Sequence, residues 1–461
     1  MTAAEAPLRS GSVPAHVPTS ADLERLAGYP YLVVSWVADD GYPVSVATTF
    51  ETDPAAGTIV LAAPAIEIPT DREIGLLGSH IHPIPGGYDK RRYLQIWGRA
   101  GERRDGRIGV APSRAWGWDE TETPFFEYSE RSVPQSRRYL ALLSKEKGRT
   151  IRPRLSFFWL ALRTTRLPFL SATAVPVLLG IAVAASHGAF TWWVALLTLI
   201  GGSFAHLAIN VTNDIFDTLS GADEANTTPT QFSGGSRVAI YDLVSIRGLS
   251  RLALALFGAA AAVGLLLVAL TGHVALVWIG AAGIAVGLAY TAPPLKLVYR
   301  GLGEIAVALG FGPIMLLGAY VAQTGRLAWE PLVLSLVPGI LISLILFVNE
   351  IPDRRSDAEA GKRTLPVRLA PDVIRAGYLV AAFAAFAVIV AGVAAGLLPW
   401  PTLIALAAVP IVMRVHRGLT VHYDSPYALM AVMGTNVNLN LAVGGLLLVA
   451  YVASIVAIQL G

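Results

Sequence analysis

The sequence contains no cysteine among its 461 residues. This absence excludes a disulfide framework, a metal site built on thiolates and a cysteine nucleophile. Charged residues are also scarce, at 15%, whereas 54% of the residues are hydrophobic. Because soluble globular proteins carry about 25% charged residues, this composition indicates a membrane protein. The net charge is only +3, so it gives no argument for a nucleic-acid partner, and we expect none.

Long apolar stretches follow Arg166, whereas charges are frequent before it. About 20 apolar residues cross the hydrocarbon layer of a bilayer, and nine stretches approach or reach this length. They lie near 167 to 186, 191 to 211, 252 to 272, 274 to 293, 304 to 323, 331 to 349, 376 to 396, 398 to 413 and 438 to 459. The sequence therefore predicts an all-α bundle of nine transmembrane helices.

The orientation of this bundle follows from the first residues and from the loops. The opening 20 residues lack the apolar core of a signal peptide, so we expect the N-terminal part in the cytoplasm. The loops on that side then hold thirteen Lys/Arg and the opposite loops hold only Arg326. Because cytoplasmic loops are rich in Lys and Arg, we predict a multi-pass protein of the cell membrane with its N-terminus inside and its C-terminus outside.

The residues before the bundle divide into three parts. We predict a disordered tail (1–20), a soluble β-barrel domain (21–130) and a basic juxtamembrane linker (131–160), followed by the membrane domain (161–461). The barrel is predicted from "YLVVSWVADDGYPVSVATTF" and "YLQIWGRAGERRDGRIGV", in which apolar runs are joined by the turn signals Asp-Asp-Gly-Tyr-Pro and Asp-Gly. The basic linker fits a helix on the anionic inner leaflet and a solvated linker equally well.

Two acidic faces stand at the predicted cytoplasmic ends of two helices. In "NVTNDIFDTLSGAD" the spacing of Asn210, Asn213, Asp214 and Asp217 places all four on one helical face. In "NEIPDRRSD" the residues Asn349, Asp353 and Asp357 repeat this spacing about 130 residues later.

Crowded carboxylates repel one another unless a cation lies between them. Oxygen ligands without Cys select a hard cation such as Mg²⁺, which often bridges to phosphate oxygens. Basic residues near both faces could bind the phosphates, and the candidates are Arg237, Lys296, Lys362 and Arg363. The alternative is that these aspartates are solvated and that the cations only set the topology.

The motif N-x-x-x-D-x-x-x-G (Asn213, Asp217, Gly221) and the D-x-x-x-D of Asp353 and Asp357 resemble those of the UbiA superfamily of intramembrane prenyltransferases. "YTAPPLKL" and "DAEAGKRTLPVRLA" are similar to its 1,4-dihydroxy-2-naphthoate polyprenyltransferase branch, which acts in menaquinone synthesis. A third aspartate found in many members is replaced here by Gly221.

This resemblance implies Mg²⁺-dependent transfer of a polyprenyl group from its diphosphate to an aromatic acceptor. It implies that Mg²⁺ is bound by Asp214, Asp217, Asp353 and Asp357, with Asn210 and Asp223 as weaker candidates. Asn213 and Asn349 would orient ligands. The diphosphate would contact the four cations named above, together with Arg166 and Tyr290.

The N-terminal stretches resemble flavin split barrels of the pyridoxamine-phosphate-oxidase-like kind. This resemblance implies FMN or another flavin as a possible cofactor of the barrel, at residues we could not identify, and a homodimer formed through it. Three other functions stay open: a UbiA-type enzyme for another phenolic or quinol acceptor, a membrane-anchored flavin-dependent reductase, and a transporter with a regulatory barrel. A transporter needs charge near the middle of the bilayer, whereas the charge here collects at helix ends.

Overall fold

The computed structural model describes residues 15–84, 87–123, 125–151, 155–226, 228–230 and 232–460. Most of the tail predicted over residues 1–20 lies outside these described residues. The chain folds as two compact units, Met1–Tyr139 and Leu140–Gly461, and the boundary falls inside a helix, α2 (Phe125–Glu146). The short helix predicted near Tyr139 is part of α2.

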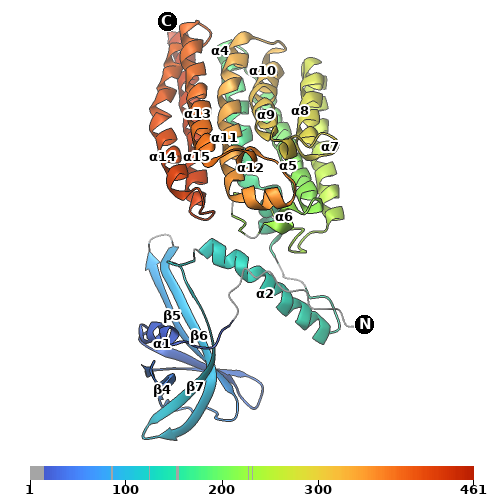
Figure 1. Cartoon of the computed structure of the whole chain (residues 1–461). Helices are drawn as coiled ribbons and strands as arrows, with labels where there is room; N and C mark the ends of the chain where they lie inside the picture. The colour runs from blue at the N-terminus through green and yellow to red at the C-terminus, as the bar shows by residue number, and fades with distance from the viewer. Residues whose placement is uncertain are drawn as a thin grey trace. The chain divides into compact units, whose positions relative to one another are not determined.

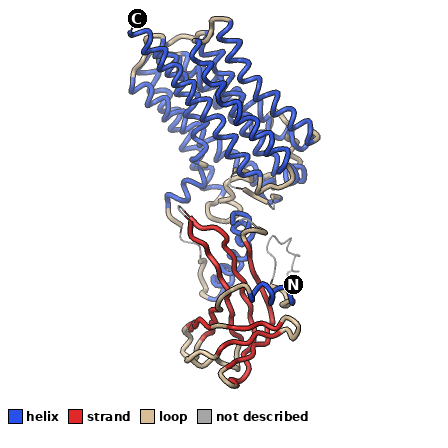
Figure 2. The backbone as a smooth tube through the Cα atoms, turned by 90° about the vertical axis from the view of Figure 1, so that its left-hand side faces the viewer, coloured by secondary structure: helices blue, strands red, loops and turns tan. Residues whose placement is uncertain are grey.

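The N-terminal unit is built on one antiparallel sheet of seven strands (Figures 1 and 2). Its strands are β1 (Leu32–Val37), β2 (Pro43–Thr48), β3 (Phe50–Asp53), β4 (Thr58–Ala62), β5 (Glu73–Ile84), β6 (Gly87–Arg104) and β7 (Arg107–Asp119), in the spatial order β2-β1-β5-β6-β7-β4-β3. The edge strands β2 and β3 are separated in sequence by Thr49 alone. The sheet must therefore curl until its two edges approach, and it forms a half-barrel, which confirms the predicted soluble β domain.

Local sequence explains the hairpins and the core of this unit. Asp105 and Gly106 both have positive φ, 47° and 73°, at the turn between β6 and β7, as expected for an Asp-Gly hairpin. Alternate residues of β1, Leu32, Val34 and Trp36, are buried, which is the period of a half-buried strand. Helix α1 (Ser20–Ala27), capped by Thr19 and Asp22, adds Leu23 and Leu26 to the same core.

The C-terminal unit is helical (Figure 1). Its elements are α3 (Phe157–Thr165), η1 (Leu167–Leu170), α4 (Ser171–Ser186), α5 (Trp192–Leu219), α6 (Ala222–Ala225), α7 (Ile246–Thr271), α8 (Ala275–Thr291), η2 (Leu297–Arg300), α9 (Gly303–Leu309), η3 (Gly310–Ile314), α10 (Met315–Thr324), α11 (Trp329–Glu359), α12 (Leu365–Arg368), α13 (Pro371–Ala394), η4 (Trp400–Ala408), α14 (Val409–His422) and α15 (Leu429–Leu460).

Within the described residues, seven helices are long and apolar enough to cross a membrane. Each of the nine predicted stretches is occupied by apolar helix, but two of them hold only the shorter α4 and α8. The helical membrane domain is thus confirmed. The predicted count of nine spans is not confirmed exactly, because seven helices are long enough and α4 and α8 are shorter. Exposed apolar side chains on α7 and α8, such as Leu254 and Trp278, suit contact with lipid.

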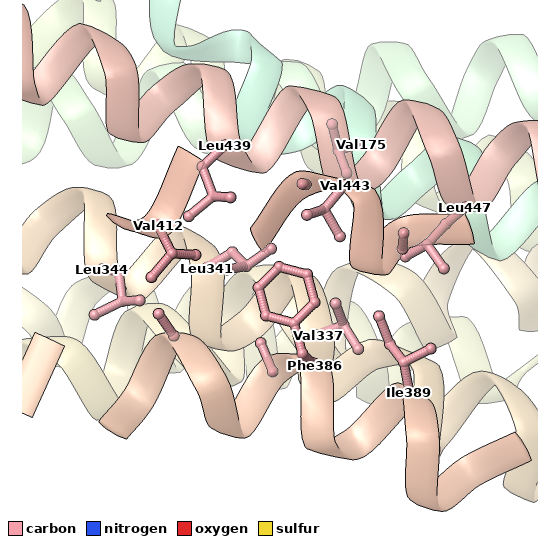
Figure 3. Packing of buried hydrophobic residues seen from close by; sticks show 14 of the residues in the cluster. Val175, Val337, Leu341, Leu344, Phe386, Ile389, Val412, Leu439, Val443 and Leu447 are labelled. Atoms are coloured by element: carbon pink, nitrogen blue, oxygen red, sulfur yellow. The ribbon is translucent and has the colours of Figure 1, made fainter. Parts of the chain in front are cut away.

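The most continuous core packs α4, α11, α13, α14 and α15 together (Figure 3). Phe386 of α13 lies among Val337 and Leu341 of α11 and Val443 of α15. Among the seven long helices α11 is the most enclosed, since 72% of the residues in its apolar segment are buried. One of the two acidic motifs is therefore carried by a rigid central helix.

Candidate active site

The two acidic motifs line one cavity of about 390 Å³. Both motifs are helical, in the last turns of α5 and α11. Among the predicted residues, the cavity lining includes Arg166, Asn210, Asn213, Asp217, Asp223, Tyr290, Asn349, Asp353, Asp357 and Lys362. The structure therefore brings together ten of the predicted site residues, from segments up to 196 positions apart.

Asp217 is the most fully contacted of these carboxylates. Its Oδ1 accepts a hydrogen bond from the Tyr299 hydroxyl at 2.7 Å. Its Oδ2 accepts from Asn213 Nδ2 at 3.0 Å and lies 3.3 Å from Lys362 Nζ. Since a buried charge without a partner costs several kcal/mol, these donors are what allow Asp217 to lie 95% buried.

Lys362 connects the two motifs. Its Nζ lies 3.3 Å from Asp217 and 3.8 Å from Asp357 Oδ1. Burial favours the neutral amine, but the two carboxylates outweigh it and raise the pKa of Lys362 well above its usual value. The ammonium ion thus takes the place between the helices where a metal was predicted.

The loop after α5 closes over the second motif. Asn226 Nδ2 donates to Asp353 Oδ1 and the backbone N–H of Gly234 donates to Asp353 Oδ2, both at 2.8 Å. The N–H of Ser236 donates to Asp214 at 3.2 Å. The backbone N–H groups of this Gly-rich loop therefore face aspartates of the chain itself.

Arg166 and Asp223 complete the charged end of the cavity. Arg166 has φ 54° between α3 and η1, and its guanidinium lies 3.5 Å from Asp214. Burial opposes its charge, but Asp214 and its neighbours raise the pKa of Arg166 further. Burial, together with the charges of Asp217 and Asp214, raises the pKa of Asp223 to about 8.

Four other predicted residues do not line the cavity within the described part of the chain. Arg237 donates to the backbone oxygens of Asp223 and Asn226, at 2.9 and 3.2 Å, and so fixes the loop. Lys296 Nζ lies 5.1 Å from the Tyr299 ring, and Arg363 is exposed. Asp214 is buried behind the lining beside Arg166. Direct contacts of these residues with a diphosphate or a metal stay predictions.

Sequence reasoning missed Asn226 and Tyr299, and it gave no role to His206. His206 lies on α5 one turn before Asn210, lines the cavity, and pairs with Thr173 at 2.8 Å through Nδ1. The position of His206 on the α5 face that carries Asn210 could have identified it as a site residue from the sequence. Asn226 and Tyr299 lie in loops and short turns, where spacing carries no such information.

Several oxygens at the charged end are buried without a donor. They are Asn213 Oδ1, Asp223 Oδ2, Asn349 Oδ1 and both carboxylate oxygens of Glu350. Buried polar atoms are nearly always satisfied, so these orphaned oxygens indicate a missing positive or hydrogen-bonding ligand. Among the residues described, no three acidic or histidine side chains already converge closely enough to hold a metal ion.

The remainder of the cavity is apolar and lined by small residues. Glycines and alanines of α5, α7, α8 and α10 face it, together with Leu267, Leu276 and Ile279. Because glycine has no side chain, these positions leave the space open. A Cβ added at Gly264 or Gly280 would meet no atom within 4 Å. A chamber of this kind suits a long flexible apolar chain whose charged head lies between the motifs.

The family model described as "UbiA prenyltransferase family" matches residues 173–434. The matched region holds most of the helical unit and excludes the sheet unit.

Several curated proteins are similar to more than half of this chain. The chain is 34% identical to a 1,4-dihydroxy-2-naphthoate octaprenyltransferase of Mycobacterium tuberculosis, over 52% of this chain and 78% of that protein. It is 28% identical to a 2-carboxy-1,4-naphthoquinone phytyltransferase of Synechocystis, over 64% and 92%. It is 26% identical to the octaprenyltransferase of Bacillus subtilis, over 68% and 98%.

Two solved structures share part of the arrangement. The apo UbiA homolog of Aeropyrum pernix K1 is 18% identical, with a TM-score of 0.47, over 60% of this chain and 97% of that one. A UbiA homolog of Archaeoglobus fulgidus bound to GPP and Mg²⁺ is 13% identical, with a TM-score of 0.44, over 62% and 99%.

Proposed function

The chain belongs to the UbiA prenyltransferase family, and we propose that it transfers a polyprenyl group from a polyprenyl diphosphate to 1,4-dihydroxy-2-naphthoate, with Mg²⁺ as cofactor. One observation carries the proposal: two aspartate motifs from separate helices meet at the charged end of a single, otherwise apolar cavity. The names of the curated relatives support the naphthoate acceptor and its place in menaquinone synthesis.

The donor set fits Mg²⁺. It consists of oxygens only, which suits a hard cation. Beside it, Asn213 Oδ1, Asp223 Oδ2 and Asn349 Oδ1 are buried without a partner among the described residues. Asp217, Asp353 and Asp357 would hold the ion, with Asp214 and Asp223 near them. When bound, Mg²⁺ neutralises diphosphate oxygens and stabilises the negative charge on the leaving group.

The chain's own residues supply binding and protection. Lys362 and Arg166 present cations at the same end of the cavity, where diphosphate oxygens can take over part of their pairing with the aspartates. The apolar lining holds the prenyl chain and keeps water away from the allylic cation that forms when the C–O bond breaks. The protein then has only to hold the acceptor ring against the cationic carbon of the prenyl group.

An acceptor panel tests the proposal. Purified protein, labelled polyprenyl diphosphate and Mg²⁺ are incubated with 1,4-dihydroxy-2-naphthoate, 4-hydroxybenzoate or homogentisate. We expect prenylation of the naphthoate above the other two. Transfer to a different acceptor alone would replace the naphthoate assignment, and transfer to none would overturn the enzymatic one.

The orientation of the membrane unit is part of this proposal. We propose that the motifs and the sheet unit lie on the cytoplasmic side, because the loops there hold the Lys and Arg residues. Since the chain has no cysteine, single cysteines at Gly361 and Gly325 can be probed with an impermeant maleimide. Labelling of intact cells at position 325 but not at 361 is expected.

The predicted flavin and the predicted homodimer of the sheet unit stay predictions. The sheet curls as a half-barrel, which is compatible with both but specific to neither. The visible absorbance spectrum of purified protein tests the flavin, and the mass of the detergent-solubilised particle by light scattering tests the dimer.

A further inference from the structure

Glu350 is a buried acid at the cavity that the proposed function does not use. It precedes Asp353 by one helical turn on α11, lines the cavity and is 5% exposed. Neither of its carboxylate oxygens has a hydrogen-bond donor among the described residues. A buried charged group in this state is costly, so its presence at the cavity wall requires a reason.

Glu304 of α9 faces Glu350. Helices α9 and α11 pack against each other, and the two side chains are close enough to share a hydrogen bond. Two carboxyl groups can share one only when one of them carries a proton. A protonated Glu304 can therefore donate to the Glu350 carboxylate next to the cavity.

Four charged or titratable groups act on Glu350. They are Glu304 on α9, Tyr290 on α8, Asp357 on α11 and Lys362 in the following loop. Lys362, the only cation of the four, is already 3.3 Å from Asp217 and 3.8 Å from Asp357. Among the described residues Glu350 forms no ion pair, so its carboxylate can accept a proton.

We propose that Glu350, paired with Glu304, accepts the hydroxyl proton of the aromatic acceptor and so acts as a catalytic base. The inference rests on the proposed function, because it concerns the same reaction. The position of Glu350 fits the order of the substrates along the cavity. The diphosphate would lie among the aspartates, and the acceptor ring would lie next to it, where it attacks the first prenyl carbon. Glu350 stands at this level, one helical turn further into the cavity than Asp353.

The step balances without a further reactant. The prenyl C–O bond breaks and its electron pair leaves with the diphosphate, while a π pair of the ring forms the new C–C bond. The acceptor O–H bond breaks, its pair becomes a ring C=O, and the proton passes to Glu350. A proton or carbon dioxide then leaves the attacked carbon, its bonding pair restores the aromatic ring, and Glu350 returns the proton to the oxygen.

The variant Glu350→Gln tests the inference, because it removes the base and keeps the shape. General-base catalysis is worth about 10² to 10⁴ in rate, so kcat should fall at least about 100-fold. Binding of a non-reactive thio analogue of the donor with Mg²⁺ should stay unchanged. A fluorinated acceptor with a more acidic hydroxyl should lose less rate than the natural one, since its proton needs less help to leave.

Two further variants separate a base from a structural acid. Glu304→Gln should move the acidic limb of the kcat–pH profile to lower pH, because an amide donor stabilises the ionised form of Glu350. Glu359→Gln is the matched control, since Glu359 is exposed on the same helix and should leave rate and profile unchanged.

The possible failures are distinguishable. If wild-type protein transfers no prenyl group to any phenolic acceptor, the proposed function fails and the inference with it. If wild type transfers and Glu350→Gln keeps its rate and pH profile, only the inference fails. A Glu350→Gln protein that loses donor-analogue binding in proportion to rate, equally for both acceptors, would also overturn the base role and leave a structural one.

Discussion

Tyr299 donates its hydroxyl to Asp217 Oδ1 across 2.7 Å, although 82 residues separate the two in sequence. The Tyr299 hydroxyl oxygen also lies 2.6 Å from Ser220 Oγ, at the end of α5. Burial and the charge of Asp217 raise the pKa of Tyr299, so the hydroxyl stays protonated and remains a donor. Tyr299 thus sets the orientation of the aspartate to which we assign Mg²⁺ binding.

Removal of this hydroxyl should weaken the metal site without destroying it. In Tyr299→Phe we expect the Mg²⁺ concentration for half-maximal transfer to rise about 10-fold or more, the usual effect of losing a group that orients a metal ligand. The measurement is transfer rate against Mg²⁺ concentration. Tyr241→Phe is a useful control, because that hydroxyl contacts Arg237 in the loop instead. Equal Mg²⁺ curves for wild type and Tyr299→Phe would contradict the orienting role.

The ionisation of Asp223 should make the metal-free protein less stable at higher pH. Its pKa is raised from 3.8 to about 8 in the folded state, so the folded state holds this proton more tightly than the unfolded state does. Its contribution to stability is complete below pH about 4 and is lost as the pH rises to about 8. We expect the unfolding temperature, followed by tryptophan fluorescence with EDTA present, to fall over this window.

Asp223→Asn is the control for that titration. Asparagine cannot ionise, so the unfolding temperature of this variant should depend less on pH between 4 and 8. Mg²⁺ should also flatten the wild-type curve, because a cation near Asp217 and Asp223 favours the ionised carboxylates. A slope in Asp223→Asn as steep as that of the wild type would show that other groups cause it.

The open space at Gly264 should limit the length of the prenyl chain. Gly264 of α7 lines the cavity, and a Cβ there would meet no atom within 4 Å. A leucine at this position would occupy part of the chamber. A mismatch of one methylene in an apolar pocket changes kcat/KM by about 10- to 200-fold. Gly264→Leu should therefore reduce kcat/KM for long donors by about 10-fold or more. The kcat/KM for geranyl diphosphate should change little.

Gly258 gives the matched substitution on the same helix. A Cβ there also meets nothing within 4 Å, but Gly258 does not line the cavity. Gly258→Leu should therefore leave the preference for chain length unchanged. If both variants shift it equally, or neither does, the chamber beside α7 is not where the chain lies.

The sequence predicted the features that depend on local pattern. The apolar stretch 252–272 became α7 (Ile246–Thr271), and the spacing of Asn213 and Asp217 correctly placed both on one face of a helix. The Asp-Gly turn at 105–106 correctly predicted the hairpin of β6 and β7. In each case neighbouring residues alone decide the structure, because the period of the apolar pattern or the φ preference of glycine fixes it.

The features that escaped prediction depend on contacts across the fold. Nothing near Asn226 shows that its amide reaches Asp353, 127 residues away. Likewise, the N–H of Gly234 faces Asp353 only because α11 packs beside the loop. The length of α4 and α8 was also overestimated, because an apolar run does not show where a helix stops and a turn begins.

The central claim is that Asp217 and Asp353 together bind the Mg²⁺ that activates a prenyl diphosphate. The most direct measurement is prenyl transfer by purified protein with Mg²⁺ and with EDTA, in the wild type and in Asp217→Asn and Asp353→Asn. The account predicts transfer only in the wild type with Mg²⁺, while all three proteins keep similar unfolding temperatures. Transfer that survives EDTA, or that either variant retains at the wild-type Mg²⁺ dependence, would contradict it.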